Sequence, residues 1–224
     1  MNRKFLLALS VALHAYVGGR LIPSLGLWPW AIVLVAVMLV LTFSMLHLGV
    51  FFYRRRHRYS DQVSWASMTA MGLFSSLLVF TLLRDALSLI LAAVALAWPA
   101  TAMQNFAAGS ALAVPLATLL VTAIGMWNAR RTAAVVNVEI PIAGLPAALH
   151  GFTIAQISDV HVGATIKGPY VDSIVDAVNR LDADMVAVTG DLVDGPVADL
   201  ARHVSPLARL ASRHGTFFVT GNHE

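Results

Sequence analysis

Three long apolar stretches constrain the fold of this chain more than any other feature. They cover residues 30–52, 65–83 and 111–127, and none of them contains a charged side chain. A helix of about 20 apolar residues crosses a hydrocarbon core of about 30 Å. Only 12% of the chain is charged, which leaves too little polar surface to cover such stretches as buried helices of a soluble protein. We therefore expect them to span a membrane.

A fourth apolar segment, residues 5–22, allows two interpretations. Two basic residues precede it and two glycines lie near its end, which is the layout of a cleaved signal peptide. The same segment also fits a membrane helix in which Arg20 extends to the interface. The membrane helix is favoured because no Ala-x-Ala-like cleavage site follows.

The charge distribution predicts the orientation. Residues 1–131 carry ten Lys and Arg against two acids, a net charge of +8, whereas residues 132–224 carry five against ten, a net charge of −5. The basic residues 54–58 and 130–131 flank the spans and are expected in the cytoplasm. We expect a multi-pass inner-membrane protein whose C-terminal part faces the cytoplasm. The acidic C-terminal part argues against nucleic acid as a partner, because nucleic acid requires a basic surface.

The pair Arg84-Asp85 interrupts the apolar pattern. The favoured interpretation places it at the outer end of the third span, with residues 86–98 as a short second piece near the interface. In the alternative it is an intramembrane ion pair that lines a pathway, because ionisable groups in lipid are usually functional.

The pattern changes after residue 131, so we divide the chain into a transmembrane helical domain, 1–131, and a second domain, 132–224. Strands are expected at 133–140, 152–157, 185–188 and 216–219, and helices at 169–181 and 197–211. The alternation from residue 152 onward predicts a βαβαβ arrangement with mainly parallel strands.

Polar motifs follow three of these strands. The motifs are Asp159-x-His161, Gly190-Asp191-x-x-Asp194 and Gly221-Asn222-His223-Glu224. The carboxyl ends of parallel strands meet at one edge, where ligands bind. Carboxylate, amide and imidazole groups suit Mn, Fe or Zn, and two such ions can clamp a phosphate and activate a water. Each motif alone is weak, but their order and placement together predict a metal site, in which the Asp191 carboxylate is suited to bridge two ions.

Residues 150–224 resemble the first half of a calcineurin-like metallophosphoesterase domain. The segments 157–163, 188–195 and 219–224 carry the resemblance, and the preceding apolar helices make the chain similar to the membrane-anchored bacterial branch of that family. The resemblance implies the first half of an α/β sandwich and two divalent metal ions. It also implies metal ligands and two catalytic residues: Asp159 and His161 on the first ion, Asp191 bridging, Asn222 on the second, His223 assisting the leaving group, and Asp194 orienting His223. No catalytic role is expected for Glu224.

The chain departs from the family pattern after Glu224, where a further histidine and a Gly-His-x-His motif should follow. We therefore expect a C-terminally truncated sequence whose parent continues for about 100 residues or more. The fragment as written is expected to bind metal weakly and to hydrolyse little.

The expected function is a membrane-anchored, metal-dependent phosphoester or pyrophosphate hydrolase. An anchored active site favours a phosphorylated substrate in the membrane, such as a lipid-linked phosphate. The alternative is a membrane sensor or transport component with a regulatory or vestigial phosphoesterase half.

Overall fold

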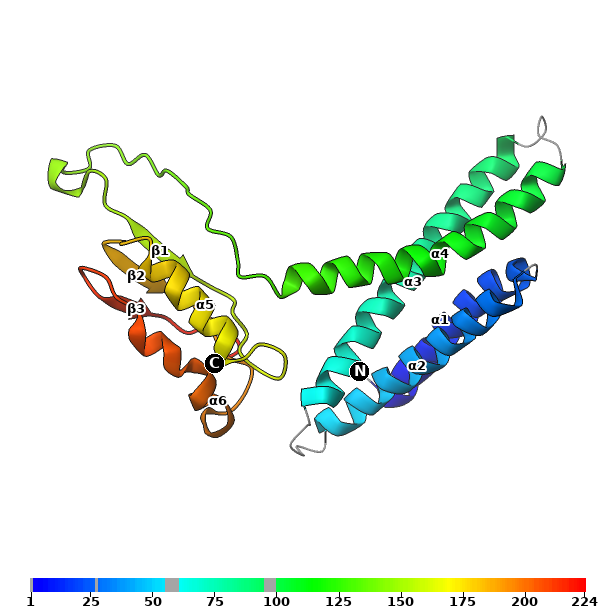
Figure 1. Cartoon of the computed structure of the whole chain (residues 1–224), viewed down its shortest axis with the longest axis horizontal. Helices are drawn as coiled ribbons and strands as arrows, with labels where there is room; N and C mark the ends of the chain where they lie inside the picture. The colour runs from blue at the N-terminus through cyan, green and yellow to red at the C-terminus, as the bar shows by residue number, and fades with distance from the viewer. Residues whose placement is uncertain (1, 27, 55–60, 95–99) are drawn as a thin grey trace. The chain divides into compact units, whose positions relative to one another are not determined.

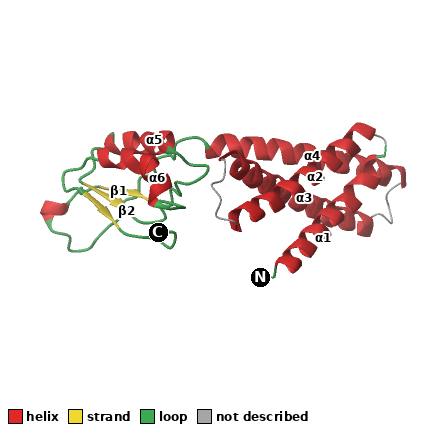
Figure 2. Ribbon diagram, turned by 90° about the horizontal axis from the view of Figure 1, so that it is seen from below, coloured by secondary structure: helices red, strands yellow, loops and turns green. Residues whose placement is uncertain are grey.

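The computed structural model describes residues 2–26, 28–54, 61–94 and 100–224. The chain divides into two compact units, Met1–Ala129 and Arg130–Glu224. In the described residues the first unit consists of helices, and the second contains a small sheet together with helices (Figures 1 and 2).

Four long helices make up the described part of the first unit. They are α1 (Arg3–Leu21), α2 (Pro29–Arg54), α3 (Asp61–Val94) and α4 (Ala100–Ala129), with the short 3-10 helix η1 (Ile22–Leu25) after α1. All four are long and apolar enough to cross a membrane, over Lys4–Leu25, Pro29–Gly49, Asp61–Ala93 and Phe106–Ala129. This agrees with the four apolar segments expected from the sequence.

The helices of the first unit pack around an apolar core. α1 lies beside α2, and α3 lies beside α4 (Figure 1). The core side chains come from all four helices and η1: Val17, Leu21, Leu25, Ala31, Val35, Met38, Phe74, Leu77, Ala111 and Val114. Other apolar side chains point outward, including Val40, which is 64% exposed, and Leu120, which is 61% exposed. An apolar outer surface of this kind suits contact with lipid.

α3 extends farther than the sequence indicated. It is continuous from Asp61 to Val94, so Arg84 and Asp85 lie within a helix rather than at its end. The prediction of a separate short helical piece at residues 86–98 is therefore wrong for residues 86–94, which belong to α3. Residues 95–98, and the basic residues 55–58 used for the orientation, lie outside the described residues.

The second unit is built on three parallel strands in the order β1-β2-β3. They are β1 (Ile154–Ile157), β2 (Met185–Val188) and β3 (Thr216–Phe218), and Val188 aligns with both Ile157 and Phe218. α5 (Gly168–Asn179) joins β1 to β2, and α6 (Val197–Val204) precedes β3. Both helices lie on the same face of the sheet (Figure 2). The βαβαβ arrangement expected from the sequence is confirmed.

The core of this sheet follows the alternation of its strands. Ala155, Ile157, Val186 and Val188 are buried and pack with Val178 of α5. The adjacent cluster of Val162, Val171, Val175 and Leu200 joins α5 to α6 and to the loop after β1. These two clusters fix the carboxyl ends of β1 and β2.

Two predictions for this unit were wrong in detail. Residues 133–140 are extended but form no strand, and Val136 and Ile140 are 79% and 75% exposed. The helix expected at 197–211 ends at Val204 and continues as the 3-10 helix η4 (Ser205–Arg209). Pro206 accounts for this change, because proline has no N–H to donate within an α-helix.

Asp184 fixes the amino-terminal end of the sheet, opposite the carboxyl ends of its strands. Its Oδ2 accepts hydrogen bonds from the backbone N–H and the hydroxyl of Thr153, at 2.9 and 3.1 Å, and its Oδ1 lies 3.0 Å from Arg213 Nη1. The backbone hydrogen bond from Thr153 is the largest of the interactions that lower the pKa of the Asp184 carboxyl. The amino-terminal end of β1 is thereby tied to that of β2.

Candidate metal centre

The three polar motifs lie on loops at the carboxyl edge of the sheet. Asp159 follows β1, Asp191 follows β2, and Asn222 follows β3. Because the strands are parallel and adjacent, these loops leave the sheet side by side.

Backbone hydrogen bonds continue the pairing of β1 and β2 into the first two loops. The amide of Asp159 donates to Gly190 O at 3.2 Å, that of His161 to Asp191 O at 3.0 Å, and that of Asp194 to Val162 O at 2.9 Å. Val162 and Val193 form a further parallel bridge. The first two motifs are therefore held in a fixed register.

Three residues of the motifs have left-handed backbone conformations. Asp159, His161 and Asp191 have φ values of 57°, 51° and 50°, and only one other described non-glycine residue, Asp182, has a positive φ. Asp and His tolerate this region better than most residues, although it remains uncommon. Such conformations gather at functional sites, where the surrounding structure enforces them.

Two glycines allow the loops after β2 and β3 to approach closely. Gly190 has a φ of 93°, and a Cβ on it would lie 2.5 Å from the backbone nitrogen of Gly221. A Cβ on Gly221 would in turn lie 2.5 Å from the backbone nitrogen of Asp191. Neither position has room for a side chain.

The side chains at this edge form two groups that could hold a metal ion. One ligand atom from each of Asp159, His161 and Asp191 lies within 4.8 Å of the others, and the same holds for His161, Asp194 and His223. Ligand atoms at about 2.1 Å from one ion are separated by up to about 4.2 Å. Small side-chain rotations would therefore bring these donor atoms to the spacing that one ion requires. Their oxygen and nitrogen atoms are of the kind that Mn, Fe or Zn binds.

Asp194 orients both histidines of the site. Its Oδ1 lies 2.9 Å from His161 Nδ1 and 2.6 Å from His223 Nδ1, and the two rings meet edge to face at 4.7 Å. With Nδ1 donating to Asp194, His161 Nε2 carries the lone pair, and this atom lies 4.0 Å from Asp191 Oδ2. The sequence interpretation paired Asp194 with His223 alone.

The pKa shifts of these groups follow from the same contacts. The hydrogen bond to Asp194 raises the pKa of His161. Partial burial acts to raise the pKa of Asp194, but the hydrogen bonds from His161 and His223 outweigh burial and lower it. The two N–H groups thus favour the ionised form of the Asp194 carboxyl.

Glu224 has structural contacts that the sequence did not reveal. Its carboxylate accepts backbone hydrogen bonds from Gly221, Asp191, Leu192 and Val193. The bond from Gly221 is the largest of the interactions that lower the pKa of Glu224. The only signal in the sequence was its position next to His223. Asn222 lies exposed on the same loop, between Gly221 and His223 in the chain.

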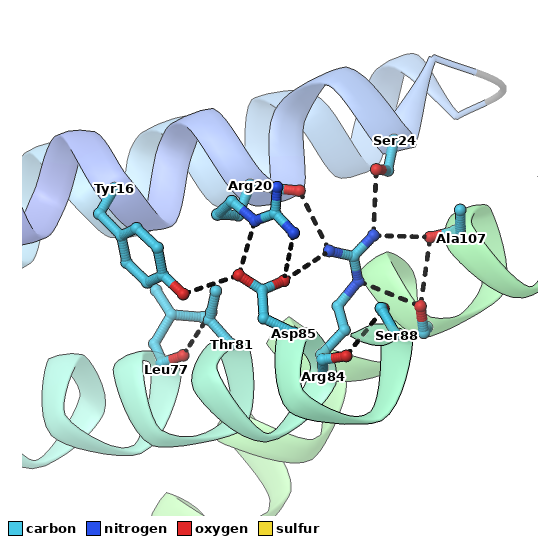
Figure 3. A network of polar contacts seen from close by, with 10 residues as sticks. Tyr16, Arg20, Ser24, Leu77, Thr81, Arg84, Asp85, Ser88 and Ala107 are labelled. Carbon is cyan, nitrogen blue, oxygen red and sulfur yellow. Dashed lines mark hydrogen bonds and ion pairs between the residues drawn. The ribbon is translucent and has the colours of Figure 1, made fainter. Parts of the chain in front are cut away.

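A second polar cluster lies in the first unit, around Arg84 (Figure 3). The Arg84 guanidinium donates to the hydroxyls of Ser110 and Ser24, both at 3.0 Å, and to the carbonyl oxygens of Ala107 and Arg20, at 3.1 and 3.3 Å. A further contact of 3.4 Å reaches Asp85, its neighbour in the chain. The Arg84 side chain is only 7% exposed. These contacts connect α3 with α1, η1 and α4.

Asp85 completes this cluster. It accepts from the Tyr16 hydroxyl at 2.7 Å and from Arg20 Nε and Nη2 at 2.6 and 3.0 Å. The Arg20 side chain is 49% exposed, whereas that of Asp85 is 14% exposed. The pair Arg84-Asp85 thus has partners from neighbouring helices within the first unit, and these contacts favour helix packing as its role.

The sequence comparisons cover the residues of the candidate metal centre. A sequence model of the family described as calcineurin-like phosphoesterase matches residues 152–224, which contain all three motifs. This segment belongs to the calcineurin-like phosphoesterase family. Asp159, His161, Asp191, Asp194, Asn222 and His223 all lie inside the matched segment.

Relatives of this phosphoesterase segment include membrane proteins. A Danio rerio protein named "Transmembrane protein with metallophosphoesterase domain" is 32% identical over 211 residues, which are 92% of this chain and 47% of that protein. A Bos taurus protein of the same name is 40% identical over 121 residues, 54% of this chain and 27% of the relative. A Campylobacter jejuni protein named as an uncharacterized metallophosphoesterase is 29% identical over 94% of this chain and 55% of its own length.

The chain spans about half the length of the Danio rerio and Campylobacter jejuni relatives. Both of these alignments include the apolar helices as well as the phosphoesterase segment, because they cover more than nine-tenths of this chain. No solved structure matches the chain.

Proposed function

We propose that the protein is a membrane-anchored phosphoester or phosphoanhydride hydrolase that depends on two divalent metal ions. The observation that carries this proposal is the convergence of Asp159, His161 and Asp191, from two separate loops, to within 4.8 Å. Membership of a phosphoesterase family supports the same reaction class.

The chemistry of the donors decides which ions fit. Two bound Mn, Fe or Zn ions would supply a water of lowered pKa and positive charge beside the phosphate oxygens. Asp159 and His161 would bind one ion through a carboxylate oxygen and Nε2. Asn222 would bind the other through its amide oxygen, and Asp191 would bridge the two.

His223 is the proposed proton donor to the leaving oxygen. Its Nδ1 is bonded to Asp194 at 2.6 Å, so Nε2 is the nitrogen that remains for the substrate. The carboxylate of Asp194 fixes the orientation of the His223 ring. This arrangement supports general acid catalysis, in which a positioned imidazole contributes about 10²–10⁴-fold.

The proposed substrate is a phosphate or pyrophosphate on a membrane lipid. Four helices able to cross a membrane would confine the catalytic segment to the membrane surface, where lipid-linked substrates are concentrated. We place the catalytic segment on the cytoplasmic face of the inner membrane, because basic residues flank the proposed inner ends of the spans.

A membrane sensor or transport component is the second candidate, and the Arg84-Asp85 pair is the feature that favours it. The contacts of Arg84 with η1 and α4 support a packing role instead. We therefore rank this candidate below the hydrolase.

Replacing Asp191 in the intact protein tests the proposed function. Asp191→Asn keeps the shape of the side chain but removes the charge suited to bridge two ions. We expect hydrolysis to fall by more than about 100-fold, beyond the 10–100-fold typical of residues that only support ligands. Glu139→Gln, on the exposed extended segment, is the matched control and should leave the rate unchanged.

The measurement is phosphate release at saturating Mn²⁺ from p-nitrophenyl phosphate and from a lipid-linked phosphate in mixed micelles. A higher kcat/KM for the lipid substrate supports the proposed substrate class, and a higher value for the soluble ester contradicts it. An Asp191→Asn variant with the wild-type rate on both substrates would exclude the hydrolase mechanism.

A further inference from the structure

Glu224 connects two loops of the metal centre through backbone amides alone. Its Oε2 accepts from Gly221 at 2.7 Å and from Asp191 at 3.0 Å, while its Oε1 accepts from Leu192 at 2.5 Å and from Val193 at 3.3 Å. Three of these four donors are consecutive residues of the loop after β2. The fourth belongs to the loop that carries Glu224 itself.

The conformation of the loop after β2 explains why a carboxylate fits there. Gly190 and Asp191 both have positive φ values, 93° and 50°. Successive amides around left-handed residues converge into a concavity that binds anions. Amides so arranged need an acceptor, and a carboxylate provides two oxygens in charge-assisted hydrogen bonds.

We propose that Glu224 is a positioning residue that maintains the left-handed conformation of Asp191 and thereby places its carboxylate for metal binding. The inference rests on the proposed metal site. Both oxygens of Glu224 are directed at amides rather than at the proposed ion. A second contact supports the same placement, because the His223 amide donates to Asp191 Oδ1 at 3.1 Å.

The charges at this edge favour such an arrangement. Asp159, Asp191 and Asp194 already place three carboxyl groups around the site. A fourth carboxylate nearby would repel them unless its charge were offset, and the four amide dipoles offset it. Replacement of Glu224 by glutamine would turn an NH₂ group toward N–H donors, leaving some amides without an acceptor.

The first experiment measures the hydrogen bonds without any metal. Hydrogen exchange of the intact, metal-free protein is followed by mass spectrometry in wild type, Glu224→Gln and the control Glu139→Gln. We expect Glu224→Gln to increase exchange at residues 191–193 and to leave β2, residues 185–188, protected. Unchanged exchange at 191–193 would overturn the inference, and faster exchange throughout β2 would attribute the effect to general loosening and overturn it as well.

The second experiment measures metal binding and turnover. Residues that orient metal ligands contribute about 10–100-fold to affinity, so Glu224→Gln should weaken Mn²⁺ binding by that factor. It should lower kcat at limiting Mn²⁺ while KM changes little, and excess Mn²⁺ should restore much of kcat. Because Mn²⁺ binding also stabilises the folded state, a general folding defect is recognised by the exchange of β2 and not by the rescue. Wild-type Mn²⁺ affinity in Glu224→Gln would overturn the positioning role.

The two proposals fail in different ways. If the wild-type protein binds Mn²⁺ but hydrolyses no phosphoester, the proposed function is wrong, and the role of Glu224 is still decided by exchange and affinity. If the wild-type protein binds no Mn²⁺, both proposals are wrong.

Discussion

At the scale of single residues, the contact between Gly190 and Gly221 determines how closely the loops after β2 and β3 approach. A methyl group on Gly190 would meet backbone atoms of Gly221, and one on Gly221 would meet Asp191. Backbone atoms at 2.5 Å cannot be avoided by a change of rotamer. Gly190→Ala and Gly221→Ala should therefore separate the two loops and weaken Mn²⁺ binding by more than tenfold, about 1.4 kcal/mol.

Gly215 provides the matched control for this prediction. Its φ is 90°, close to that of Gly190, but a Cβ on Gly215 would have no neighbour within 4 Å. Gly215→Ala therefore introduces backbone strain without a steric clash. It should lower the free energy of unfolding by about 1–3 kcal/mol and leave Mn²⁺ affinity unchanged. Isothermal titration of the intact variants with Mn²⁺ measures the difference. Equal losses of affinity at Gly190 and Gly215 would contradict the steric explanation.

The positions of the site residues followed from the sequence better than their contacts did. Asp159, Asp191 and Asn222 each come soon after a short apolar strand, and parallel strands place their carboxyl ends at one edge. The contacts of Glu224 depend on the left-handed backbone at Asp191, which residue types do not specify. The second hydrogen bond of Asp194, to His161, depends likewise on the register of two loops.

At the scale of elements, periodicity located the helices, but their ends depended on particular residues. Pro206 ended α6 early, and α3 continued past Arg84 because neighbouring elements supply acceptors for its guanidinium. Residues 133–140 have the alternation of a strand. A strand requires a partner, and none of the described residues pairs with this segment.

The Arg84 cluster gives a prediction about the stability of the helical unit. Arg84→Met removes five donor contacts from a nearly buried position, and breaking a buried ion pair costs about 3 kcal/mol or more. Arg20→Met should cost less, under about 1 kcal/mol, because that side chain is half exposed. Thermal unfolding in detergent compares the two variants.

Arg84→Lys separates packing from a charged pathway. Lysine keeps the positive charge but lacks the planar fork that reaches both Ser24 and Ser110. If the cluster serves helix packing, Arg84→Lys should be destabilised nearly as much as Arg84→Met. Wild-type stability in Arg84→Lys would contradict this and favour a role for the charge itself, as the sensor or transport alternative requires.

At the scale of the whole molecule, the proposed function depends on the side of the membrane that the phosphoesterase segment faces. Four candidate spans place both ends of the chain on the same side, and the basic residues 54–58 and 130–131 beside the spans favour the cytoplasm for the C-terminal part. A green fluorescent protein fused after the phosphoesterase domain should fluoresce, and alkaline phosphatase at the same position should be inactive.

Alkaline phosphatase inserted after Leu25, between the first two candidate spans, should be active, because this connection is expected outside the cytoplasm. If residues 5–22 are a cleaved signal peptide instead of a helix, the C-terminal fusions still report the cytoplasm, and the amino-terminal sequence of the mature protein reveals the cleavage. An active alkaline phosphatase at the C-terminus would show that the phosphoesterase segment faces the opposite side of the membrane from the one proposed. The proposed substrate would then have to be a phosphorylated lipid of the outer leaflet, and the basic residues 130–131 would lie on the side where basic residues are less frequent.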